Sequence, residues 1–133
     1  MSYNTKKIIN PELDEGKEQR SGLVIYQKIR DLTSYLYITF VKYPKSEKFS
    51  LVSDYKRTLF DFIGLIITAQ KKYYKKTTLQ DADVKLETLR IFNDLSYDLH
   101  CIDIKKYENI SKMLDEIGRL LGGWIKKQKE KPT

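Results

Sequence analysis

The sequence predicts an all-α protein folded as an antiparallel up-down four-helix bundle. Its 133 residues include only three prolines and six glycines, which disfavours a turn-rich β architecture. Apolar residues recur three to five positions apart along four stretches of about twenty residues, as on one face of a helix. Because short connections separate these stretches, consecutive helices are expected to pack antiparallel.

The first two helices are separated by the segment YPKSEKF. The first is expected from about Leu23 to Tyr43, because Pro44 disfavours helical dihedrals at the residue before it. Ser50 is a candidate N-cap for the second helix. That helix is expected to run from about Leu51 to Lys75, with Tyr73 on its apolar face.

The third and fourth helices meet near His100. The third is expected from about Leu79 to Leu99, with a threonine available as its N-cap. Asp103 is the expected N-cap of the fourth helix, whose apolar positions continue at spacings of three and four to Trp124.

The bundle is expected to span residues 22–127. Residues 1–21 carry mixed charges without sustained periodicity and are expected to form a mobile N-terminal arm, and residues 128–133 a basic C-terminal tail. No apolar run approaches the length of a membrane span, and no apolar block follows the N-terminal lysines. With one cysteine and no internal disulfide, the expected location is cytoplasmic, without membrane association.

Basic charge is unevenly distributed along the chain, whose formal net charge is +7. Residues 42–76 contain nine basic and three acidic residues, residues 81–103 two and six, and residues 105–131 eight and four. The segment KKYYKK interleaves lysines with tyrosines; a solvated helix end explains it alone, but the further basic residues favour a surface that binds a polyanion. The candidate nucleic-acid-binding residues are Lys45, Lys48, Lys56, Arg57, Lys71, Lys72, Lys75 and Lys76.

The sequence offers little for catalysis. His100 and Cys101 are the only residues of their types, and neighbours at a helix junction rarely reach the geometry of a nucleophile and its base. Asp94 and Asp98 lie one turn apart without a second pair of metal ligands, and no glycine-rich phosphate loop follows a strand. The expectation is a non-enzymatic protein without metal or cofactor, and an enzyme centred on His100 and Cys101 is a remote alternative.

The stretch EIGRLLGGWIKKQ places two adjacent glycines beside the only tryptophan. Gly118 and Gly122 lie one turn apart, where missing side chains permit close packing. Gly123 is equally well explained as a helix C-cap, so both interpretations stay open. Trp124 favours an anchoring role, and Gly118, Gly122 and Trp124 are the candidate subunit interface.

Three stretches carry a resemblance to a known family: FVKYPKSEKFSLVSDYKRTLFDFIGLIITA, LETLRIFNDL and YENISKMLDEIGRLLGGWIK. They resemble the accessory variability determinant (Avd) proteins of diversity-generating retroelements, within a wider family that includes proteins encoded in intervening sequences of large-subunit ribosomal RNA genes. The similarity covers about residues 23–127 and is most specific at YPKSEKF and DEIGRLLGGW. The intervening-sequence branch typically has a serine-proline-serine-asparagine stretch in its second helix, and TLFDFIGLIITA here favours the Avd branch.

The resemblance implies a homopentameric barrel of bundles without catalytic activity. Proteins of this type bind RNA and DNA through a basic surface and associate with the retroelement's reverse transcriptase, which copies template RNA into mutagenised cDNA. The resemblance adds Arg90 and Arg119 to the candidate binding residues, together with Lys126 and Lys127 near the C-terminus. The alternative is an intervening-sequence-type structural or interaction protein with no reverse transcriptase partner.

Overall fold

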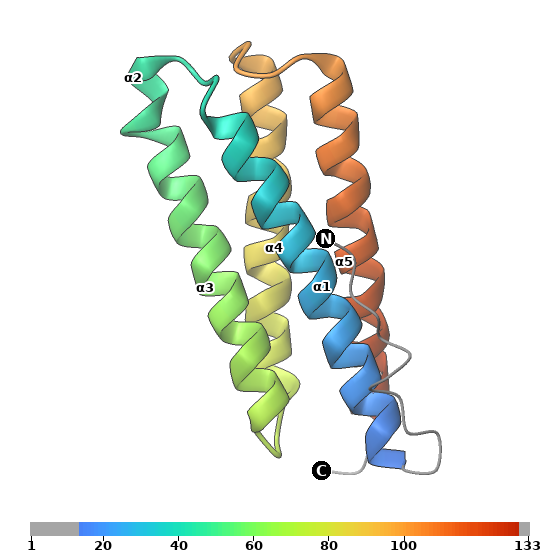
Figure 1. Cartoon of the computed structure of the whole chain (residues 1–133). Helices are drawn as coiled ribbons and strands as arrows, with labels where there is room; N and C mark the ends of the chain where they lie inside the picture. The colour runs from blue at the N-terminus through green and yellow to red at the C-terminus, as the bar shows by residue number, and fades with distance from the viewer. Residues whose placement is uncertain (1–13, 131–133) are drawn as a thin grey trace.

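Four long helices pack side by side, and a one-turn helix joins the first of them to the second (Figure 1). The computed structural model describes residues 14–130, with side chains from residue 24 to residue 129. No strand occurs within residues 14–130, so the prediction of an all-α four-helix bundle is confirmed. The helices are α1 (Asp14–Phe40), α2 (Lys45–Lys48), α3 (Leu51–Lys71), α4 (Lys76–Asp98) and α5 (Ile104–Glu130).

Neighbouring helices run antiparallel in an up-down arrangement. Between α1 and α5, the Lys28 ammonium lies 2.8 Å from the Glu116 carboxylate, and the Asn109 side-chain amide donates to the Tyr35 hydroxyl at 3.1 Å. Residue numbers therefore rise along α1 as they fall along α5. Figure 1 shows α3 and α4 completing the bundle, with α2 and the α4–α5 connection at one end and the α3–α4 connection at the other.

The core is built from the apolar faces that the periodicity predicts. Burial of this apolar surface supplies the main driving force for packing the helices together. Tyr73 is the exception: it lies outside the core with 84% of its surface exposed, because α3 ends two residues before it. The buried positions that confirm the prediction are Ile29, Leu32, Leu36 and Phe40 in α1, Tyr55, Leu59, Phe62 and Ile66 in α3, Leu79, Ala82, Leu86 and Leu89 in α4, and Ile110, Leu114, Ile117 and Leu121 in α5.

Helix α1 begins earlier and α5 ends later than the sequence suggests. Helix α1 starts at Asp14, so residues 14–21 of the expected arm are helical. Helix α5 continues to Glu130 and includes the first part of the expected tail. The remainder of both expectations, residues 1–13 and 131–133, lies outside the described residues.

The N-termini of the helices are capped in different ways. The Asp103 carboxylate accepts a hydrogen bond from the Lys106 backbone N–H at 2.8 Å, which confirms Asp103 as the N-cap of α5. Ser50 occupies the N-cap position of α3, but its hydroxyl contacts Ser46 and Glu47 of α2 and caps no N–H of α3. The expected threonine cap of α4 is wrong, because that helix already begins at Lys76.

One buried hydrogen bond joins α4 to the segment between α1 and α2. The Tyr43 hydroxyl donates to Ser96 Oγ at 2.7 Å, and Ser96 Oγ in turn donates to the Phe92 carbonyl at 2.8 Å. Burial raises the pKa of Tyr43 to about 12, so its hydroxyl stays protonated as a donor. This bond fixes YPKSEKF against the bundle at the α2 end.

Candidate nucleic-acid interface

The KKYYKK segment forms the connection between α3 and α4, although the sequence predicted it to be the end of a helix. Helix α3 stops at Lys71, Lys72 has extended dihedrals, and α4 begins at Lys76. The Lys75 ammonium donates to the Ala69 carbonyl at 2.8 Å and also to the Lys72 carbonyl. It thereby satisfies backbone carbonyls that the end of α3 leaves without helical partners.

The lysines of this connection therefore differ in whether their ammonium groups are available to bind a ligand. Lys75 is half-buried and committed to backbone carbonyls, so it is a structural residue of the turn. Lys71, Lys72 and Lys76 are exposed and form no ion pair with any described residue. We call the exposed group Lys71, Lys72, Tyr73, Tyr74 and Lys76 the loop patch.

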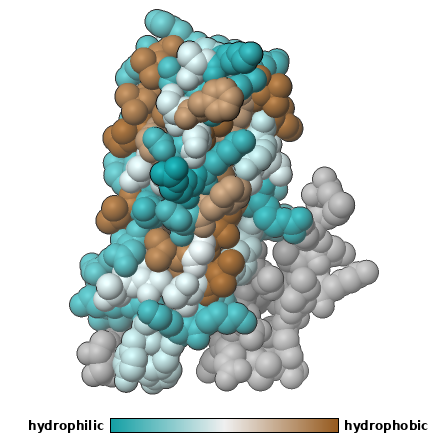
Figure 2. All heavy atoms as spheres, turned by 90° about the vertical axis from the view of Figure 1, so that its left-hand side faces the viewer, coloured by the Kyte–Doolittle hydropathy of each residue, from teal (hydrophilic) through white to brown (hydrophobic). Residues whose placement is uncertain are grey.

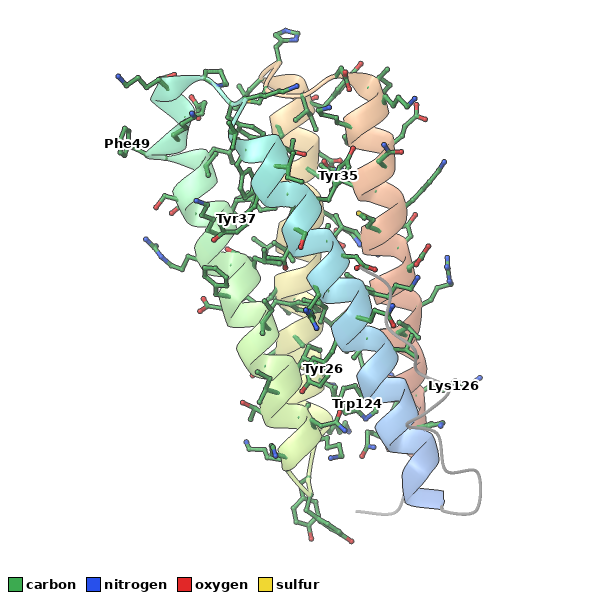
Figure 3. All side chains as sticks on the ribbon, viewed as in Figure 1. Tyr26, Tyr35, Tyr37, Phe49, Trp124 and Lys126 are labelled. Carbon is green, nitrogen blue, oxygen red and sulfur yellow. The ribbon has the colours of Figure 1, made fainter. Side chains whose placement is uncertain are left out.

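A second basic group lies at the opposite end of α3. Lys45 and Lys48 are exposed on α2, and Phe49 beside them is 83% exposed and points away from the bundle (Figure 3). We call Lys45, Lys48 and Phe49 the α2 patch. It is separated from the loop patch by the 21 residues of α3, or about 30 Å at the rise of an α-helix.

The positive surface is not continuous along α3. Lys56 is half-buried, with its ammonium 4.6 Å from the centroid of the Tyr37 ring, a cation–π contact. Arg57 lies 3.6 Å from the Asp54 carboxylate. Figure 2, viewed from the side of α3, shows apolar and hydrophilic side chains mixed along this face. The basic residues near the two ends of α3 therefore form two separate patches rather than one surface.

Arg90 is engaged inside the α4–α5 groove. Its guanidinium donates to the Asp115 carboxylate and lies 3.8 Å from the Glu87 carboxylate, and its side chain is only 32% exposed. A Cβ added to Gly118 would lie 2.6 Å from the terminal nitrogen of Arg90. Gly118 thus provides the space that the guanidinium occupies.

Arg90 and Arg119 line the same surface pocket of about 450 Å³. Both residues were candidates for phosphate binding. The pocket also contains three carboxylates, so its charge is mixed and does not suit a phosphate chain. We name it the α4–α5 pocket, and its lining residues are Asp83, Leu86, Glu87, Arg90, Asp115, Gly118 and Arg119.

The glycines of α5 do not end the helix, which continues for seven residues beyond Gly123. The interpretation of Gly123 as a C-cap is therefore wrong. A Cβ at Gly122 or Gly123 would meet no atom within 4 Å, so Gly122 does not serve close packing within this bundle. Figure 3 shows Trp124 directed toward the bundle and Lys126 away from it, and Lys127 is also exposed.

His100 and Cys101 form a turn between α4 and α5. His100 adopts a φ of 62°, and its N–H and that of Cys101 donate to the carbonyls of Tyr97 and Ser96, closing the end of α4. Burial, assisted by the charge of Glu47, raises the pKa of the Cys101 thiol. A raised pKa disfavours the thiolate that a cysteine nucleophile requires, so the local chemistry is that of a structural turn.

Two further features bear on function. Among the side chains of residues 24–129, no group of three from histidine, cysteine, aspartate or glutamate is arranged to hold a metal ion. None of the helices in this part of the chain is both long enough and apolar enough to cross a membrane.

These observations define a helical-bundle protein whose unpaired lysines are concentrated at the ends of its helices. The family follows from comparison: residues 23–128 match the family model described as bAvd-like, and the chain belongs to that family. The resemblance to Avd proteins is thereby confirmed over nearly the whole bundle. Comparison with curated proteins gives no match.

Sequence reasoning placed Tyr73 and Tyr74 in a helix, whereas both lie in the connection after α3. Periodicity extended α3 through Tyr73 because a tyrosine fits a helical apolar face equally well. The signal against this was local: four lysines surround the two tyrosines, and Lys75 provides a side chain able to cap the helix from within the segment.

Proposed function

We propose that this protein is a non-enzymatic accessory protein of a diversity-generating retroelement that binds RNA and DNA. In this role it associates with the reverse transcriptase and its template RNA during mutagenic cDNA synthesis. The observation that carries the nucleic-acid part is the loop patch, where three exposed lysines have no ion pair among the described residues. Membership of the bAvd-like family supports the accessory role.

The binding mechanism is electrostatic. Each lysine that neutralises a phosphate releases condensed counterions, so affinity rises with the number of contacts and falls steeply with salt. Assembly into a homopentamer repeats the patches around a ring, and several weak contacts then act together as avidity. Sequence specificity is left to the enzyme and to RNA structure.

Charge reversal at the loop patch tests this function. The variant Lys71→Glu, Lys72→Glu and Lys76→Glu should lose roughly 100- to 1,000-fold in affinity near 0.1 M salt if each lysine contacts one phosphate. Fluorescence anisotropy with a structured RNA and a random DNA duplex, repeated across salt concentrations, measures the loss. The losses should be similar for unrelated sequences.

A matched control reverses three exposed lysines outside the candidate set: Lys105, Lys112 and Lys129. It changes the net charge equally, so only a local interface distinguishes the two triple variants. Equal losses of affinity in the two triple variants would show that the loop patch contributes only through the total charge of the protein. Absence of binding by the unmodified protein at low salt would contradict the function itself. Co-purification with the retroelement's reverse transcriptase tests the partner separately.

The proposed pentamer is tested by Gly122→Leu. Because a Cβ at Gly122 meets no atom within 4 Å, the bundle itself should tolerate leucine and gain up to about 1 kcal/mol from helix propensity. An interface that uses this open face should instead be blocked, which light scattering would detect as a smaller mass. The exposed helical Gly64 of α3, equally open, provides the control Gly64→Leu. An unchanged mass for Gly122→Leu would exclude Gly122 from the interface.

A further inference from the structure

The loop patch presents two aromatic rings to solvent at the tip of the bundle. Tyr73 is 84% exposed and Tyr74 72% exposed, although a tyrosine ring carries a large apolar surface. The two rings meet edge to face, with centroids 4.8 Å apart and planes at 87°. In this arrangement each ring braces the other while most of their combined surface stays open.

The backbone beneath these rings is held in place. Hydrogen bonds from Lys75 to the carbonyls of Ala69 and Lys72 tie the connection to the last turn of α3, and Lys76 immediately starts α4. A braced pair on a tethered turn loses little conformational freedom when a planar group stacks on it.

The surrounding charge identifies the planar group. No acidic residue occurs between Asp61 and Asp81, whereas Lys71, Lys72 and Lys76 lie on both sides of the tyrosines. A site for another protein's apolar surface would not require this concentration of unpaired positive charge. Exposed lysines that flank an open aromatic face are the combination found where proteins bind single-stranded nucleic acid.

We propose that Tyr73 and Tyr74 form a stacking site for unpaired bases, which gives the protein a preference for single-stranded over duplex nucleic acid. This proposal rests on the proposed nucleic-acid binding and specifies its substrate class. The lysines contact the backbone of either form, but a duplex keeps its bases stacked on each other and unavailable to the tyrosines. Every base has a π-face, so the preference is for strand state rather than sequence.

Alanine and phenylalanine substitutions separate stacking from charge. Tyr73→Ala/Tyr74→Ala should bind a single-stranded oligonucleotide about 5- to 150-fold more weakly, the range for loss of one stacked base. Affinity for a duplex with the same number of phosphates should change little. Tyr73→Phe/Tyr74→Phe keeps both rings and should retain the single-strand affinity. The control is Phe60→Ala, which removes an exposed ring of α3 outside both patches and should leave both affinities unchanged.

A base-specific readout completes the test. An oligonucleotide containing 2-aminopurine should change its fluorescence on binding to the unmodified and phenylalanine proteins, and less at saturation with the alanine variant. If the alanine variant binds single strands and duplexes as the unmodified protein does, the stacking proposal is wrong while the electrostatic function stands. If the unmodified protein binds neither form at low salt, both are wrong.

Discussion

The α3–α4 connection and the α4–α5 pocket both contain basic side chains, but Lys72 of the connection and Arg90 of the pocket have different surroundings. Lys72 in the loop patch has no ion pair with any described residue, whereas Arg90 in the pocket contacts the carboxylates of Asp115 and Glu87. The difference arises from the neighbouring helix: α5 brings Asp115 against Arg90, while nothing described in the bundle packs over the connection. The sign of a residue's charge therefore does not establish that a ligand can use it.

Neutralising one basic residue in the connection should affect mainly nucleic-acid binding, and neutralising one in the pocket should affect mainly stability. Lys72→Met should weaken nucleic-acid binding up to about tenfold and lower the slope of log affinity against log salt by about 0.9, with little change in stability. Arg90→Met should cost about 1 kcal/mol of unfolding free energy through lost charge-assisted hydrogen bonds, with affinity nearly unchanged. Salt-dependent anisotropy and urea unfolding measure the two effects. A large affinity loss for Arg90→Met would remove the distinction between the regions.

A substitution at Gly118 tests whether this glycine makes room for Arg90 in the α4–α5 pocket. Gly118→Ala gains up to about 1 kcal/mol in helix propensity but places its Cβ 2.6 Å from the Arg90 guanidinium, which must shift away. The net change in unfolding free energy should be near zero. In an Arg90→Met background the alanine should become stabilising by about 0.5–1 kcal/mol. A double-mutant cycle by urea unfolding measures this coupling, and strict additivity would show that Gly118 does not accommodate Arg90.

The Lys28–Glu116 pair should give the smallest effect. A hydrogen bond and charge attraction from Lys28 lower the pKa of Glu116. A lowered folded-state pKa contributes stability that is complete above the unfolded value of about 4.3 and is lost as pH falls through the folded value. Both side chains are about 40% exposed, so solvent screening limits the contribution to at most about 0.5 kcal/mol.

Unfolding of Glu116→Gln against the unmodified protein at pH 7 and pH 3 measures this contribution. The difference between the two proteins should shrink at the lower pH. A difference that grows on acidification would contradict the assigned direction of the pKa shift.

The core was the part of the fold that the sequence predicted best. Apolar positions such as Leu32, Leu59 and Leu86 follow the helical period, and burial of each is required whatever the neighbouring helix. The sequence predicted the ends of the helices less well. Whether α3 stops at Lys71 or at Lys75 depends on hydrogen bonds from a side chain that periodicity does not register.

The candidate site was predictable in composition but not in arrangement. The composition of KKYYKK identified its lysines as candidate binding residues, and the resemblance to Avd proteins added Arg90 and Arg119. It did not separate Lys72 from Lys75, whose ammonium donates to backbone carbonyls of its own connection, and it did not show that Arg90 is paired. Asp115 reaches Arg90 from 25 residues away, and no local pattern links the two.

By itself, the sequence determined the helical class, the apolar faces, the Asp103 cap and the resemblance to Avd proteins, because these depend on local spacing and residue type. Only the tertiary structure decided which basic side chains are neutralised and where α3 ends. It also decided that Tyr73 and Tyr74 stand exposed together at the tip of the bundle. These outcomes depend on which groups come within a few ångströms when the helices pack, and electrostatic and hydrogen-bond energies change steeply over that distance.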